Sequence, residues 1–108
     1  MQRKEKDMTI KMRDFGRSLV TRSAGRLAYD AISPAVASAT ERVVLDFEGV
    51  DVITNSFADE VFGHLVLDMG MDELRARTTF RGVQPFFAQV VRTAMDSRES
   101  QREIPAVC

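Results

Sequence analysis

The chain has 108 residues and a mass of 12.1 kDa, with 44% apolar and 29% charged residues. This length and balance predict one globular domain and exclude a mostly disordered chain. No apolar stretch is long enough to cross a bilayer, and the start lacks the apolar core of a signal peptide. The single cysteine, Cys108, excludes a disulfide framework and a multi-cysteine zinc site within one chain. We expect a soluble, cytoplasmic protein whose domain spans residues 8–97, between flexible segments at 1–7 and 98–108.

Charge is distributed unevenly along the chain, although its formal net value is only -1. Residues 1–26 hold eight Lys and Arg against three Asp and Glu, and residues 75–108 hold six Arg against three acids. Between them, residues 41–74 hold one Arg against nine acids. Such blocks either fold back on one another as solvated surface or steer charged partners toward the protein. Because a domain that binds nucleic acid is usually basic overall, nucleic acid is disfavoured as a partner.

The first part of the chain predicts a strand hairpin. Apolar and polar residues alternate from Met8 to Met12, which is typical of a half-buried strand. Residues 13–16 resemble a turn, because Gly16 is free to take a positive φ. Residues 18–20 would then return as a second strand beside the first.

A helix is expected after the hairpin. Thr21 or Ser23 is suited to cap its N-terminus, and apolar residues recur behind them at helical spacing. Pro34 should end or kink this helix near Ser33, because proline has no N–H to donate to the preceding turn.

The middle of the chain predicts a buried strand and then the clearest helix. The run 43–47 is almost continuously apolar, as in a central strand that is covered on both faces. Ser56 would begin the helix, with Asp59 completing a capping box. Apolar residues at every fourth position from Phe57 form its buried stripe, and Gly70 is a natural stop.

The last third predicts a strand and a helix. Residues 75–81 alternate in polarity, as in a strand with one exposed face, and Pro85 suits the first turn of a helix that ends near Asp96. Strands that alternate with helices indicate an α/β fold with a partly parallel sheet under helical cover. Right-handed crossovers would place the central strand beside the strand that follows Gly70.

One cluster of side chains has the composition of a catalytic or metal site. Asp59, Glu60 and His64 lie on the same predicted helix, with Glu60 and His64 four residues apart. This spacing leaves open a small enzyme or a metal-binding site, in which carboxylates would have to supply the remaining ligands. No glycine-rich nucleotide-binding motif is present, so the chain itself indicates no cofactor.

Two other features could bind a ligand or a partner. Arg75, Arg77 and Arg81 would share one face of the predicted strand and could hold phosphate, nucleic acid or an acidic protein, or else form a solvated edge. Ser56 at a helix start would place its hydroxyl, or a phosphate on it, at the positive end of the helix dipole, or else act as a plain cap.

Residues 43–50 read Val-Val-Leu-Asp-Phe-Glu-Gly-Val, and residues 53–61 read Ile-Thr-Asn-Ser-Phe-Ala-Asp-Glu-Val. Together they resemble the core of STAS-like domains, above all a group whose helix opens with Ser/Ala-Phe-Ala-Asp-Glu. The resemblance extends from about Met8 to Met95. It implies a mixed sheet of four or five strands covered by about three helices, in agreement with the α/β order of elements.

STAS domains include the bacterial anti-sigma-factor antagonists, so the resemblance implies regulation and signalling by protein–protein interaction, without enzymatic activity. The partner of those antagonists is an ATP-binding serine kinase of the histidine-kinase-like fold, and Ser56 matches the serine that it phosphorylates. We expect a kinase-like or anti-sigma-like partner to contact Thr54, Asn55, Ser56, Asp59 and Glu60. We expect no cofactor, no metal and no membrane association.

Overall fold

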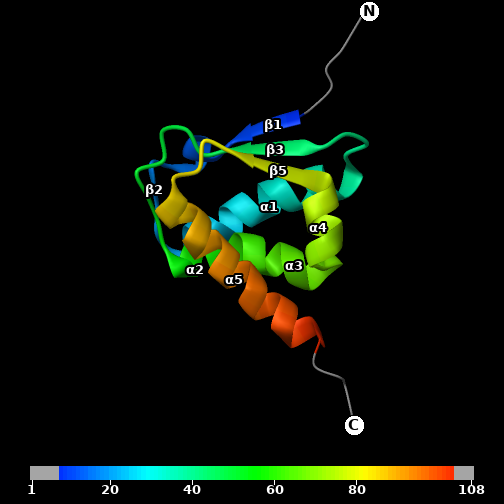
Figure 1. The fold of residues 1–108 in the computed structure, drawn as a ribbon. Helices are drawn as coiled ribbons and strands as arrows, with labels where there is room; N and C mark the ends of the chain where they lie inside the picture. The colour runs from blue at the N-terminus through cyan, green and yellow to red at the C-terminus, as the bar shows by residue number, and fades with distance from the viewer. Residues whose placement is uncertain (1–7, 104–108) are drawn as a thin grey trace, which may run out of the picture.

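In the computed structural model, which describes residues 8–103, the chain folds into two layers (Figure 1). One layer is a three-stranded sheet of β1 (Met8–Lys11), β3 (Val43–Asp46) and β5 (Thr78–Arg81), in the order β1-β3-β5. The long helices α1 (Arg22–Ser38) and α5 (Pro85–Glu103) lie on the same side of this sheet, with the shorter helices beside them. The predicted α/β class is therefore confirmed.

β3 is the central strand, as its continuous apolar run predicts. Val43 and Leu45 are fully buried, and Val44 is 6% exposed. β3 pairs in parallel with β1 on one side and with β5 on the other, where Leu45 lies beside Phe80. The strand that follows Gly70 is therefore its neighbour, as right-handed crossovers require.

The expected hairpin between residues 8–12 and 18–20 is wrong. β1 pairs with β3, whereas β2 (Ser18–Leu19) pairs in parallel with β4 (Val52–Ile53) in a separate two-stranded sheet. The cause lies in η1 (Met12–Phe15), a 3-10 turn whose first residue is fully buried and which carries the chain out of the first sheet. The described residues thus form three plus two parallel strands in place of the mixed sheet that we predicted.

α1 begins directly after Thr21, whose side chain accepts from the Ala24 N–H, so of the two predicted caps Thr21 is the one used. It does not end near Ser33 but continues through Pro34 to Ser38. Ile32 and Val36 flank the proline on the inner face and are fully buried, whereas the proline itself is exposed. Their burial in the core outweighs the backbone hydrogen bond that the proline removes.

The helical segment after β4 has three parts in direct succession. α2 (Asn55–Ala58) is followed by the π-helical stretch η2 (Asp59–Gly63) and by α3 (His64–Met69). The predicted apolar stripe is buried, from Phe57 through Val61 and Leu65, with Met69 half-buried at its end. Gly70 ends the segment as predicted, with a φ of 89°.

Residues 71–77 form the helix α4 (Met71–Arg77) and not the start of a strand, so the expected strand 75–81 is wrong in its first half. Met71 and Leu74, about one helical turn apart, are both buried. Glu73 and Arg77 form an ion pair four residues apart on the exposed side. These contacts favour the helix, although the local alternation of polarity also fits a strand.

α5 starts at Pro85 as predicted but continues to Glu103, past the expected end at Asp96. The first residues of the predicted tail are therefore helical. Residues 1–7 and 104–108, which we expected to be flexible, lie outside the described residues. Within residues 8–103, no helix has the length and apolar character needed to cross a membrane.

Candidate partner-binding site

Thr54 fixes the loop between β4 and α2. Its hydroxyl donates to the Val20 carbonyl at 2.5 Å and accepts from the Phe57 N–H at 3.3 Å. Its own N–H donates to the Leu19 carbonyl at 3.0 Å. Thr54 is therefore the N-cap of the helical segment. The capping box that we predicted at Ser56 is wrong, because Ser56 lies inside the first turn.

Asn55 and Ser56 follow this cap on the outside of the first turn. Both residues are exposed, and their side chains form no hydrogen bond with another described residue. Because the hydrogen bonds of Thr54 fix the start of this turn, the backbone that carries the two side chains is held in place. Partner contact at both residues and phosphorylation of Ser56 stay predictions.

Asp59 lies in an ion-pair cluster that joins the first and last helices. Arg98 of α5 donates to both carboxylate oxygens, at 2.6 and 2.7 Å, and Arg22 of α1 donates to Oδ2 at 2.9 Å. The bonds from Arg98, with a further contribution from Arg22, lower the pKa of Asp59 against the opposing effect of burial. The pKa of Arg98 is raised in return.

Glu60 extends the cluster along α1. It accepts from Arg22 at 3.1 Å, and Arg26 lies 3.9 Å from its other oxygen. The side chains of Asp59 and Glu60 are only 22% and 18% exposed. Contact of these two carboxylates with a partner stays a prediction, and their observed role is to hold helices together.

Two glycines allow the helices to approach closely enough for these ion pairs. A Cβ added at Gly25 in α1 would lie 2.8 Å from the Cβ of Glu60. A Cβ added at Gly63 would lie 2.7 Å from Asp59 Oδ1 and 2.8 Å from the Cγ of Arg98. These separations are shorter than side chains tolerate, so only glycine fits both positions without displacing a neighbour.

His64 does not join Asp59 and Glu60. Its ring stacks on Tyr29, with the centroids 3.9 Å and the planes 3° apart, and its Nε2 lies 4.0 Å from Asp68 Oδ1. The Tyr29 hydroxyl donates to Asp68, and burial together with this contact raises the pKa of Tyr29. Among residues 8–103, no three His, Cys, Asp or Glu side chains are grouped as metal ligands would be. The three residues that the sequence grouped are thus divided, with His64 beside Tyr29 and Asp68 and the two carboxylates beside arginines.

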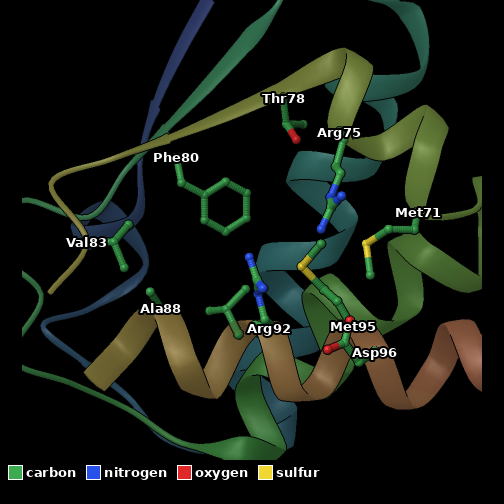
Figure 2. A pocket seen from close by; sticks show the side chains of 10 residues that line it. Met71, Arg75, Thr78, Phe80, Val83, Ala88, Arg92, Met95 and Asp96 are labelled. Atoms are coloured by element: carbon green, nitrogen blue, oxygen red, sulfur yellow. The ribbon is translucent and has the colours of Figure 1, made fainter. Parts of the chain in front are cut away.

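The predicted shared face of Arg75, Arg77 and Arg81 is wrong, because the first two lie on α4 and the third on β5. Arg77 pairs with Glu73, and Arg81 pairs with Asp46 at 3.3 Å. Arg75 instead lines a groove beside α5 (Figure 2). The three arginines therefore do not form one phosphate- or nucleic-acid-binding surface.

Arg22, Arg26 and Arg98 are site residues that no sequence motif indicates. The one signal for them is the charge distribution, in which basic blocks at both ends flank an acidic middle block. The ion pairs at Asp59 and Glu60 join these blocks. The charge blocks were predicted either to fold back on one another or to steer charged partners. These contacts show the first of these, since they join basic and acidic blocks within the chain.

The fold and the helix start at Thr54 define a small α/β domain with an anchored, polar first turn. Residues 24–92 match the model of the family described as a STAS-like domain of unknown function (DUF4325). The match covers more than half of the chain, so the chain belongs to this STAS-like family, and the resemblance seen in the sequence is confirmed. No curated protein and no solved structure matches the chain significantly.

Proposed function

We propose that this chain is a regulatory module that acts by binding a protein partner and not by catalysis. The observation that carries the proposal is the exposure of Asn55 and Ser56 on a turn that Thr54 anchors to Leu19 of β2 and to Val20. Polar groups held on a fixed backbone lose little conformational freedom on association. The family supports the same role, since STAS-like domains are generally regulatory modules without enzymatic activity.

The partner that we propose is an ATP-binding protein of the kinase-like or anti-sigma-like class. This part of the proposal rests on the resemblance to the anti-sigma-factor antagonists, in which a serine at the matching helix start is phosphorylated. Ser56 is exposed, and a phosphate on it would add about 1.5 to 2 negative charges at neutral pH. Asp59 and Glu60 follow within the next turn, but Arg22 and Arg98 already offset their charges. The added negative charge would therefore change the interaction with the partner more than the interactions within this chain.

The test is the capture of partners from a lysate of the source cell, with Mg-ATP present, by the wild-type chain and by two variants. Asn55→Lys places a cation on the proposed surface. Thr40→Lys adds the same charge at an exposed position between α1 and β3, so it is the matched control. We expect one nucleotide-binding protein that the wild type and Thr40→Lys capture and that Asn55→Lys loses.

Mass spectrometry of the captured bait tests the switch in the same experiment. A phosphate on Ser56 supports regulation by phosphorylation, whereas an unmodified Ser56 in an intact complex removes the switch and keeps the binding role. Capture that is equal for Asn55→Lys and Thr40→Lys would contradict the proposed surface.

A further inference from the structure

A groove of about 280 Å³ lies between β5 and α5, on the side of the molecule where β5 ends the sheet (Figure 2). α4 closes one end of the groove, through Met71 and Arg75. The groove is separate from the helix start at Thr54 and from the ion-pair cluster of Asp59, since it shares no residue with either.

The floor of the groove is apolar and packs against the hydrophobic core. Phe80 and Val83 line it from the sheet side, and Val91 and Met95 line it from α5. The Phe80 ring lies 5.7 Å from Phe47 and 5.4 Å from Phe62, measured between centroids, so the core holds it from behind. Phe80 as a whole is half-buried, and it lines the groove. This surface suits one or two apolar side chains of a ligand.

Two arginines extend into the groove from opposite sides. Figure 2 shows the guanidinium of Arg75 reaching down from α4 and that of Arg92 reaching up from α5. Both residues are exposed, and neither forms an ion pair with a carboxylate within residues 8–103. Asp96 at the rim supplies one negative charge against these two positive charges. The groove therefore has a cationic excess above an apolar floor, which complements a carboxylate attached to an apolar group.

The backbone of β5 provides a third binding element. β5 pairs with β3 on one side only, and within the described residues no strand pairs with its other edge. Four residues of free edge, about 13 Å long, can accept the backbone of a short extended segment. An edge-to-edge pair of two copies is disfavoured, because it would bring two cationic grooves together.

We propose that this groove is a second docking site, which binds an extended segment of a partner protein that carries an acidic side chain next to apolar ones. The backbone of the segment adds to the free edge of β5. One apolar side chain covers Phe80 and Met95, and the carboxylate lies between Arg75 and Arg92. This site is independent of the surface at Ser56, so either proposal can fail without the other.

The test uses the full chain and a phage-displayed library of random ten-residue peptides as the probe. Selected peptides are synthesised, and their Kd values are measured by fluorescence polarisation against four variants. Arg92→Ala removes one cation of the groove, and Ala88→Trp fills the groove from an exposed position on α5. Arg17→Ala makes the same charge change as the first variant at an exposed site elsewhere. Asn55→Lys alters only the surface of the proposed function.

We expect the selected peptides to combine acidic with apolar residues and to bind Arg92→Ala and Ala88→Trp about tenfold or more weakly than the wild type. Arg17→Ala and Asn55→Lys should bind them as the wild type does. Circular dichroism confirms that each variant is folded, which the exposure of all four positions favours. The proposal is overturned by a library without enrichment, by peptides without acidic residues, or by equal losses in Arg92→Ala and Arg17→Ala. A dimer that Ala88→Trp abolishes would assign the groove to a second copy and would likewise overturn it.

Discussion

Arg98 and Asp59, 39 residues apart in sequence, form two parallel hydrogen bonds of 2.6 and 2.7 Å. Arg98 lies on the last helix and Asp59 at the start of the π-helical stretch η2, so this one pair connects the C-terminal helix to the segment that carries the candidate site. Two-pronged contacts between guanidinium and carboxylate are directional as well as strong. The pair therefore sets the position of α5 relative to the exposed first turn at Ser56.

The first prediction concerns the stability that this pair provides. Both side chains are about three-quarters covered, at 27% and 22% exposed, so solvent screens their attraction only in part. We expect Arg98→Ala to lower the free energy of unfolding by about 1 to 2 kcal/mol, measured by urea denaturation. Arg17→Ala breaks a pair whose side chains are 73% and 59% exposed, and should cost less than about 0.5 kcal/mol. Equal losses in the two variants would contradict the prediction, because the Arg98–Asp59 pair would then stabilise the protein no more than an exposed pair does.

The second prediction is a pH dependence of the same pair. The pKa of Asp59 is lowered in the folded protein, first of all by the Arg98 hydrogen bonds. The stability from this site is therefore complete above the ordinary aspartate pKa of about 3.9, and is lost as the pH falls through the lower folded pKa. Asp59→Asn should be less stable than the wild type near neutral pH, and the difference should shrink below about pH 4. Urea denaturation at neutral pH and at pH values below 4 checks this, and a difference that stays constant with pH would contradict it.

The third prediction separates the observed cap from the one that we expected. Thr54→Ala removes the cap and the bond to the Val20 carbonyl, so we expect a loss of about 1 to 2 kcal/mol in the free energy of unfolding. Ser56→Ala should change it by less than about 0.5 kcal/mol, because its side chain is exposed and unbonded within the described residues. The reverse order of the two losses would mean that Ser56 caps the helix in solution.

Local signals predicted those parts of the fold that depend on neighbouring residues. The run 43–47, the cap at Thr21, the stop at Gly70 and the helix start at Pro85 are each recognisable within a few residues, and all four agree with the structure. Each depends on backbone conformation or on continuous burial, which a short stretch of sequence specifies by itself.

Other parts depend on contacts between distant residues. The alternation in residues 75–81 fits a strand, whereas the burial of Met71 and Leu74 and the Glu73–Arg77 ion pair favour a helix over residues 71–77. In the same way, the arginines of the site were not predicted from the sequence, because Arg22 and Arg98 are 37 and 39 residues away from Asp59 along the chain. Spacing along the chain carries no signal for such a meeting, so only the fold shows it.

The fourth prediction concerns Pro34 inside α1. Its ring lies at an exposed position in the fourth turn, where it removes a backbone hydrogen bond and strains the helix. We expect Pro34→Ala to raise the free energy of unfolding by about 1 to 2 kcal/mol, after allowing for the freer unfolded chain. Thermal and urea unfolding measure this, with Ala35→Gly as a control that should be destabilising. A variant no more stable than the wild type would mean that α1 is already bent to accommodate the proline.

The fifth prediction tests how Gly63 and the ion pair depend on each other. Alanine normally favours a helix over glycine by up to about 1 kcal/mol, but a Cβ at Gly63 would overlap Asp59 Oδ1 and the Cγ of Arg98. We therefore expect Gly63→Ala to destabilise the protein by about 1 to 2 kcal/mol in spite of its helix propensity.

The overlap at Gly63 involves the Arg98 side chain, so its effect should depend on that side chain. In an Arg98→Ala background the overlap with Cγ is gone and Asp59 is free to rotate away, so Gly63→Ala should become neutral or stabilising there. Gly25→Ala meets the Cβ of Glu60 and a backbone oxygen instead, so its effect should be the same in both backgrounds. A double-mutant cycle from urea denaturation measures the two coupling energies. Coupling that is absent at Gly63, or equally large at Gly25, would mean that the glycine is required by the backbone packing and not by the ion pair.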